Sequence, residues 1–185
     1  MRRLSKSSDS SLPVDDGWGE APDPKLELRP ELKQEQEPNA HDMALRLLTR
    51  REHGASELAR KLQQRGVSRE QAQETITELA EQGWQSDARF AEQFARDHAA
   101  RGDGPMKIRA AMQSRGVPEH LIAEALKTLD VDWLANASAA RVKRFGTDVP
   151  LSTAEQARQQ RFLMTRGFSA SDARTAVRKN DFNQD

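Results

Sequence analysis

The chain has 185 residues, of which 5% are aromatic and 31% are charged, and its mean hydropathy is −0.86. So little apolar material excludes one large globular core and favours several small ones. The absence of cysteine excludes disulfides, thiolate metal sites and cysteine nucleophiles, and the lack of a long apolar run or a signal-peptide core predicts a cytoplasmic protein.

The first 39 residues differ in composition from the rest of the chain. Residues 1–39 carry 6 basic and 9 acidic side chains, a net charge of −3, whereas residues 43–179 carry 23 basic and 17 acidic ones, a net charge of +6. The leader also holds five of the eight prolines and no helical apolar stripe, which predicts disorder over 1–39. Trp18 within it is interpreted as a tail residue rather than a docking point.

A first group of three helices is expected after the leader. The apolar spacing predicts a helix over 41–53, a second helix capped by Ser56, and a third over 68–82. Ser68 with Gln71 three residues later is a capping-box pattern, which places the start of the third helix.

A second and a third group follow the same plan. Trp84 and Trp133 could stack on nucleobases, but each is expected to be buried where two groups join. Ser86 is expected to cap the next helix. Pro105 suits the first turn of the helix after it. The third group is expected to start at an Asp132 cap beside Trp133, with its middle helix capped by Ser152 and Glu155.

One short motif recurs in all three groups. It consists of an apolar residue, two further residues, Arg, Gly, an apolar residue and a helix-starting residue, and it occupies 62–68, 112–118 and 163–169. The glycine can adopt the left-handed conformation that ends a helix, and the arginine suits the negative end of the helix dipole. The repeat therefore predicts one helix-turn-helix unit occurring three times.

Three sets of apolar residues occupy equivalent positions in the repeats. They are Leu62, Met112 and Leu163; Ala72, Ile122 and Ala173; and Ile76, Leu126 and Val177. The fold class predicted is all-α, with three tandem three-helix repeats in an elongated curved array. The expected boundaries are a leader over 1–39 and repeats over 40–84, 85–130 and 131–185.

Several motifs in these repeats are together those of a known family. They are Leu-Leu-x-Arg-Arg-Glu-His (47–53), Ser-Glu-Leu (56–58), Ser-Asp-x-Arg-Phe (86–90), Gly-x-Gly-Pro-x-x-Ile (102–108) and Asp-x-Asp-Trp (130–133). On these motifs, residues 41–180 resemble the RecX family, bacterial regulators of the RecA recombinase. Two features depart from the pattern: the first and third repeats lack the Gly-Pro pair, and Asp148 is acidic in a break where a basic loop would favour nucleic acid.

The resemblance implies a negative modulator of RecA that acts without enzymatic activity or a cofactor. Proteins of this kind bind RecA in the groove of its filament on single-stranded DNA and lower its ATP hydrolysis, strand exchange and co-protease activity. The resemblance also implies weak, sequence-tolerant binding to single- and double-stranded DNA, a role in DNA repair, recombination and the SOS response, and a monomeric state.

The basic side chains of the repeats suit such contacts, because an excess of cations without a base-reading pattern favours phosphate binding. Candidate contacts to RecA or DNA are Arg50, Arg51, Lys61, Arg65, Lys107, Arg109, Arg115, Arg141, Arg144, Arg158 and Arg161. The competing interpretation of any one of them is a helix C-cap charge or a solvated residue paired with a nearby glutamate.

No catalytic or metal-binding pattern is present in the sequence. The segment 102–107 lacks the Gly-Lys-Ser/Thr of a phosphate loop, and His41, His53, His98 and His120 have no metal-ligand spacing, so surface or capping roles are expected for them. The alternative function, from another class, is a stand-alone helix-turn-helix-type protein that binds DNA without sequence preference and needs no recombinase.

Overall fold

The computed structural model describes residues 39–178, so the expected disorder of the leader lies outside the described residues. Within 39–178 the chain forms nine helices and no strand. The first six are α1 (Ala40–Leu48), α2 (Ala55–Gln63), α3 (Arg69–Glu81), α4 (Asp87–Ala100), α5 (Pro105–Gln113) and α6 (Glu119–Thr128). The last three are α7 (Trp133–Phe145), α8 (Thr153–Thr165) and α9 (Ala170–Arg178). The all-α class and the three-by-three arrangement are confirmed.

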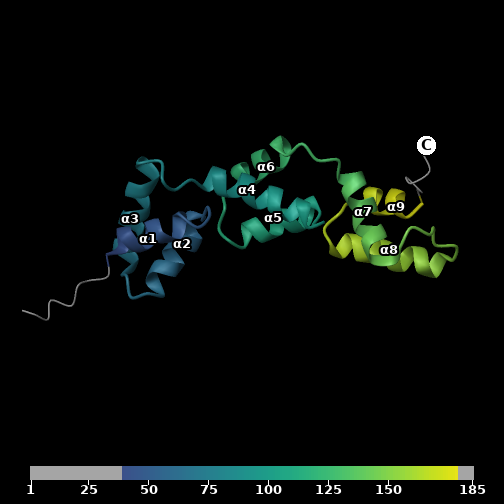
Figure 1. The fold of residues 1–185 in the computed structure, drawn as a ribbon, viewed down its shortest axis with the longest axis horizontal. Helices are drawn as coiled ribbons and strands as arrows, with labels where there is room; N and C mark the ends of the chain where they lie inside the picture. The colour runs from purple at the N-terminus through teal and green to yellow at the C-terminus, as the bar shows by residue number, and fades with distance from the viewer. Residues whose placement is uncertain (1–38, 179–185) are drawn as a thin grey trace, which may run out of the picture. The chain divides into compact units, whose positions relative to one another are not determined.

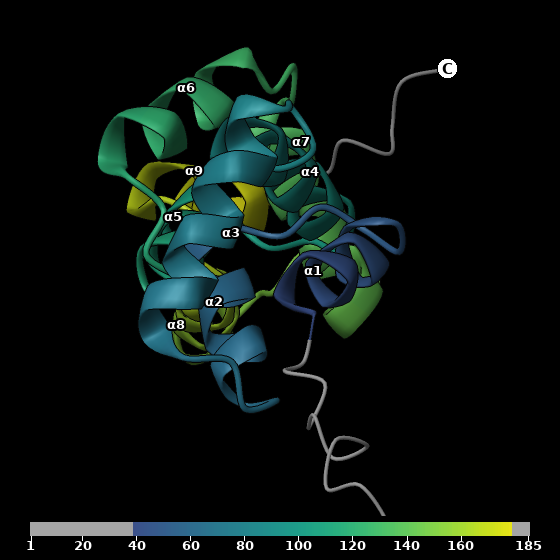
Figure 2. The ribbon, with the colours of Figure 1, turned by 90° about the vertical axis from the view of Figure 1, so that its left-hand side faces the viewer.

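Each consecutive set of three helices packs on itself, and we call the sets module 1 (α1–α3), module 2 (α4–α6) and module 3 (α7–α9). Every extensive helix pairing lies within one module (Figure 1). Figure 2 shows α1, α2 and α3 together at the near end of this view. The cores are separate clusters around Leu58 and Leu62 in module 1, Ile108 and Ile122 in module 2, and Phe168 in module 3.

The repeated Arg-Gly motif forms the same turn in all three modules. Gly66, Gly116 and Gly167 have φ values of 90°, 77° and 88°, in the left-handed region that glycine adopts without steric cost. The apolar residue after each glycine is buried in the core of its own module. In module 1 the following Ser68 and Gln71 form the predicted capping box. The sequence repeat is therefore a repeat of structure.

Two of the predicted helix starts and ends differ in the structure. The first helix ends at Leu48 rather than at residue 53. The prediction that Ser56 caps the second helix is wrong, because the cap is Gly54 and the helix begins at Ala55. Glycine offers no side-chain oxygen, so the free N–H groups at the start of α2 need an acceptor from elsewhere.

Module 2 supplies that acceptor, through the start of α4. The Asp87 carboxylate accepts a hydrogen bond from the Ala55 N–H at 2.7 Å and another from the Gln85 amide at 2.8 Å. Arg89 pairs with Glu52 of the preceding segment at 2.8 Å. The Ser-Asp-x-Arg-Phe motif thus joins two modules as well as capping a helix. We call this junction seam 1.

Module 2 and module 3 join through backbone hydrogen bonds at seam 2. The Gly104 N–H donates to the Arg166 carbonyl oxygen at 2.8 Å, and the Met106 N–H donates to the Gly167 carbonyl oxygen at 3.0 Å. A Cβ atom on Gly104 would lie 2.4 Å from the Gly167 backbone. Asp103 lies 3.4 Å from the Arg166 guanidinium. The Gly-x-Gly-Pro segment therefore fits directly against the Arg-Gly turn of module 3.

The two seams differ in how they deal with the free backbone N–H group at the start of a helix. In seam 1, α2 begins with Ala55, whose N–H needs the Asp87 carboxylate. In seam 2, α5 begins with Pro105, which has no N–H to satisfy. Module 3 therefore needs no carboxylate like that of Asp87, the first residue of α4. The first residue of α7 is Trp133, which packs against the cores of modules 2 and 3. This difference explains why module 1 can lack the Gly-Pro pair.

Trp84 is not buried, contrary to prediction. Its side chain is 58% exposed, while the backbone carbonyl groups of Gly83 and Trp84 accept hydrogen bonds from Arg89 at 3.0 Å. At seam 1 the buried aromatic ring next to Gly54 of module 1 is that of Phe90, not the indole ring of Trp84. Trp133 at seam 2 is half-buried, as a tryptophan between two modules is expected to be.

Candidate functional site

Each seam borders a surface hollow with basic walls. The hollow beside seam 1 has a volume of roughly 470 Å³, and four arginines from modules 1 and 2 line it together with two acidic residues. The arginines are Arg51, Arg60, Arg101 and Arg115, and the acids are Glu57 and Asp97. Phe94 forms part of its wall, with the His98 ring stacked 4.1 Å away and the Arg115 guanidinium 4.8 Å from the ring centre. We call this the seam-1 hollow.

The hollow beside seam 2 has a volume of roughly 340 Å³ and a different lining. Its apolar surface comes from Ala99 and Ala100 of α4, Ala139 and Ala140 of α7, and Phe162 of α8. Four cations surround this apolar surface, and none of its lining residues is acidic: the cations are Arg101, Lys143, Arg144 and Arg166. We call this the seam-2 hollow.

Arg101 lines both hollows, so the two hollows adjoin at this residue. Arg101 is exposed at the C-terminal end of α4. Within residues 39–178 no carboxylate lies in ion-pair distance of Arg60, Arg101, Lys143 or Arg144. Cations without a carboxylate partner keep their charge available to an external anion. The arrangement can therefore bind a polyanion along both seams.

An arginine–aromatic cluster adjoins the seam-2 hollow. The guanidinium groups of Arg144 and Arg158 lie 5.6 Å and 5.5 Å from the centre of the Phe145 ring. The Phe145 ring meets the edge of the Phe162 ring at 5.3 Å, and Arg166 lies 5.5 Å from the centre of the Phe162 ring. Cation–π contacts of this kind hold the arginines in place. Arg158 and Arg166 are also paired with Glu155 and Asp103.

The eleven candidate contact residues divide into three groups in the structure. Those that line a hollow are Arg51, Arg115 and Arg144. Those that are paired with acids or bound to backbone outside the hollows are Lys61, Arg65, Lys107, Arg109 and Arg158. Those that are exposed without an ion pair in the described part of the chain are Arg50 and Arg161. Arg141 is the exception treated next.

Arg141 does not agree with its expected role as a contact residue. Its side chain is only 1% exposed, and its guanidinium donates to the carbonyl oxygens of Thr147 at 3.4 Å and Asp148 at 3.0 Å. It therefore holds the loop between α7 and α8 from inside module 3. A basic residue in a helical pattern cannot be assigned to the surface from sequence alone when the following loop folds over it.

Arg60, Arg101, Lys143 and Arg166 line the hollows but are not among the candidates from sequence. Arg101 precedes the Gly-x-Gly-Pro break and could have been noticed as a helix-ending arginine like Arg65. Its importance depends on two modules meeting around it, which no local pattern encodes.

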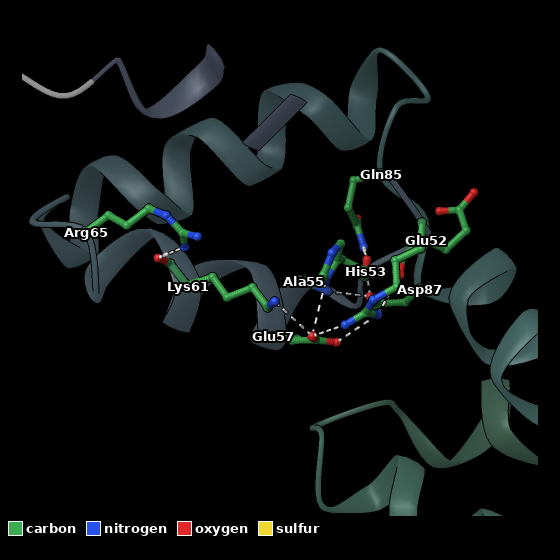
Figure 3. Close-up of polar contacts among 9 residues, drawn as sticks. Glu52, His53, Ala55, Glu57, Lys61, Arg65, Gln85 and Asp87 are labelled. Carbon is green, nitrogen blue, oxygen red and sulfur yellow. Dashed lines mark hydrogen bonds and ion pairs between the residues drawn. The ribbon is translucent and has the colours of Figure 1, made fainter. Parts of the chain in front are cut away.

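A cluster of charged side chains around the buried His53 and Glu57 forms part of the wall of the seam-1 hollow (Figure 3). His53 is 2% exposed, and its Nδ1 lies 3.2 Å from Glu57 Oε1. Arg51 approaches the same carboxylate at 2.6 Å and Lys61 at 3.7 Å. Burial, with the nearby Arg51 charge, lowers the pKa of His53. Burial alone would raise the pKa of Glu57, but the hydrogen bond and charge of Arg51 outweigh it, so this pKa is also lowered.

Acidification from pH 7 to about 5.5 is expected to lower the stability of the protein through His53. Because the pKa of His53 in the folded protein lies below the ordinary histidine value of 6.5, the unfolded chain takes up the proton first, and stability present above pH 6.5 is lost as the pH falls. The measurement is chemical denaturation at several pH values. His53→Gln should flatten this dependence, whereas His120→Gln, an exposed control, should keep it. Equal slopes for both variants would contradict the assignment.

The described residues offer neither a metal site nor a membrane span. Residues 39–178 contain no cluster of three or more potential metal-ligating side chains. In the same part of the chain, no helix combines the length and apolarity that crossing a bilayer requires.

His53 and His98 pair with carboxylates at the seams, so the prediction of surface or capping roles is wrong for the buried His53.

Comparison with known proteins identifies all three modules. The family models for the first, second and third three-helix domains of RecX match residues 40–79, 86–126 and 130–177. The chain is 45% identical over 140 residues to "Regulatory protein RecX" of Halorhodospira halophila, with 76% of this chain and 87% of the relative covered. It is 43% identical over 143 residues to the protein of the same name from Chromohalobacter salexigens, with 77% and 93% covered.

Solved structures give the same result for the fold. The crystal structure of RecX from Lactobacillus salivarius is similar with a TM-score of 0.64 at 21% identity, covering 77% of this chain and 95% of that one. A second crystal structure, of regulatory protein RecX, has a TM-score of 0.63 at 25% identity, with 74% and 69% covered. With its three domain matches and its relatives above 40% identity, the chain belongs to the RecX family of regulatory proteins.

Proposed function

We propose that this protein is a negative modulator of RecA that binds the recombinase filament and acts by binding alone. Limited ATP hydrolysis, strand exchange and co-protease activity are the expected consequences for RecA. The observation that supports the proposal most is the pair of arginine-rich hollows that adjoin at Arg101, in a chain of the RecX family. A nucleoprotein filament presents the repeated phosphates that such a surface attracts.

The modular construction favours binding at several points. Each cation of the hollows contributes a weak, salt-dependent contact. The cations of each hollow come from two adjacent modules. When one contact forms, the covalent link between modules raises the effective concentration of the next. Binding to a filament can therefore be strong without any single tight site, and it needs neither a cofactor nor a catalytic group.

Arg101→Gln is expected to weaken binding of the full-length protein to RecA filaments on single-stranded DNA by about fivefold, since one charged contact contributes roughly 1 kcal/mol. The slope of log affinity against log salt should fall by roughly 0.7 if the lost contact is to a phosphate. Co-sedimentation and the RecA ATPase rate measure both effects. Arg46→Gln is the matched control, because Arg46 is exposed on α1 and lines neither hollow.

The same experiment separates this proposal from its alternative. A stand-alone DNA-binding protein would partition equally between RecA filaments and naked DNA at the same salt concentration. A filament modulator should favour the filament and lower ATP hydrolysis. Equal partitioning, with RecA turnover unchanged, would reject the proposal in favour of general DNA binding.

A further inference from the structure

The two hollows differ in chemistry although they share Arg101. The seam-1 hollow has the acids Glu57 and Asp97 among its lining residues and is predominantly polar. The seam-2 hollow has no acid in its lining, and its exposed surface is more apolar than polar. An apolar concavity surrounded only by cations fits a ligand that is flat and apolar in one part and anionic in the parts on either side.

We propose that the seam-2 hollow receives one unstacked nucleobase of a single-stranded nucleic acid, and that the flanking phosphates contact Arg101, Lys143 and Arg144. This inference rests on the proposed function and goes further, because it assigns the base-binding position to one hollow. The base would lie on the alanine surface of α4 and α7, against Phe162 and the Arg166 guanidinium above that ring. Aromatic rings and arginine planes both bind unpaired bases by stacking.

The lining also predicts a preference for single-stranded over double-stranded nucleic acid. A base within a duplex is stacked on both faces, so only the phosphates of a duplex can reach the cations unless the pair is opened. Asn136 donates a hydrogen bond to the Ala99 carbonyl oxygen at 3.4 Å and is the one uncharged polar side chain in the lining. A single amide so held does not distinguish four bases, and the site is expected to accept any base. The cationic path past Arg101 into the seam-1 hollow suits a polymer with regularly spaced charges better than a short acidic peptide.

The test compares two DNA strands of equal charge. A thymidine 15-mer and a 15-mer of abasic spacers carry the same phosphates, but only the first has bases. The full-length protein is expected to bind the thymidine strand at least about fivefold more tightly. Ala139→Leu, which fills the hollow from an exposed position on α7, should abolish this ratio, whereas Ala135→Leu, exposed on the same helix and outside the hollow, should keep it.

Other outcomes overturn the inference in distinguishable ways. If both strands bind the wild-type protein equally while Arg101→Gln weakens both, the proposed function stands and the base site does not. If an acidic tryptophan-containing peptide binds in a manner that Ala139→Leu abolishes, and the two strands bind alike, the hollow is a peptide site. If Ala135→Leu and Ala139→Leu lower the ratio equally, the effect is not local and the inference is rejected.

Discussion

Gly167→Ala is expected to lower the free energy of unfolding by about 2–5 kcal/mol. Two costs combine at this position. The left-handed φ of 88° costs an alanine roughly 1–2 kcal/mol, and the new Cβ would lie 2.4 Å from the backbone of Lys107 across seam 2. Relief of such a clash requires the modules to move apart, at a further cost of roughly 1–3 kcal/mol. Chemical denaturation of the full-length variant measures the sum.

The equivalent glycine of module 1 provides a matched control. Gly66 has the same conformation, with a φ of 90°, but a Cβ there meets nothing within 4 Å. Gly66→Ala should therefore carry only the conformational cost, roughly 1–2 kcal/mol. Gly116→Ala should be intermediate, because its Cβ meets the Ser56 side chain at 2.6 Å rather than backbone. Equal losses at the three positions would show that the seams do not form in solution.

Gly104→Ala separates the two contributions. Gly104 has a φ of −83°, which alanine adopts freely, yet its Cβ would lie 2.4 Å from the Gly167 backbone. The loss of stability in the Gly104→Ala variant therefore measures only the close contact between Gly104 and Gly167 at seam 2. If Gly104→Ala is as stable as the wild type, the close approach at seam 2 is wrong even though the turn conformations are right.

The local elements of this fold could be predicted from the sequence because their signals are local. Glycine turns, the Ser68 cap and the Asp132 cap depend on residues within one turn of the chain, and the structure has them where expected. The threefold repeat follows from the same patterns. Even so, Leu126 is only half-buried although its counterparts Ile76 and Val177 are buried, since Ala125 takes the inner position in α6.

The seams could not be predicted, because they join residues that no local pattern relates. Asp87 bonds Ala55 across 32 positions, and Arg166 reaches Asp103 across 63. The position of Arg101 between two hollows depends on such long-range contacts. The burial of Arg141 depends on how the loop at Thr147 and Asp148 folds back over it, which the helical pattern does not encode either. For this reason only Arg51, Arg115 and Arg144 of the candidates from sequence line the hollows, and all the exposed candidates stay predictions.

Ile122→Ala is expected to destabilise the protein by about 2–5 kcal/mol, since Ile122 is fully buried in the core of module 2 and its truncation leaves a cavity. Leu151→Ala, at a position that is 98% exposed, is the control and should change stability by less than about 0.5 kcal/mol. Denaturation followed by far-ultraviolet circular dichroism measures both.

The position of module 2 gives this variant a second consequence. Module 2 contributes Asp87 to seam 1 and Gly104 to seam 2, so its unfolding removes the contacts that both neighbours make with it. In an array stabilised by nearest-neighbour contacts, a loss in the middle therefore lowers the stability of the ends as well. In a background with Trp18→Phe and Trp84→Phe, which leaves Trp133 at seam 2 as the one tryptophan, the fluorescence midpoint should shift in Ile122→Ala by as much as the circular dichroism signal. An unchanged Trp133 transition would mean that module 3 folds independently of module 2.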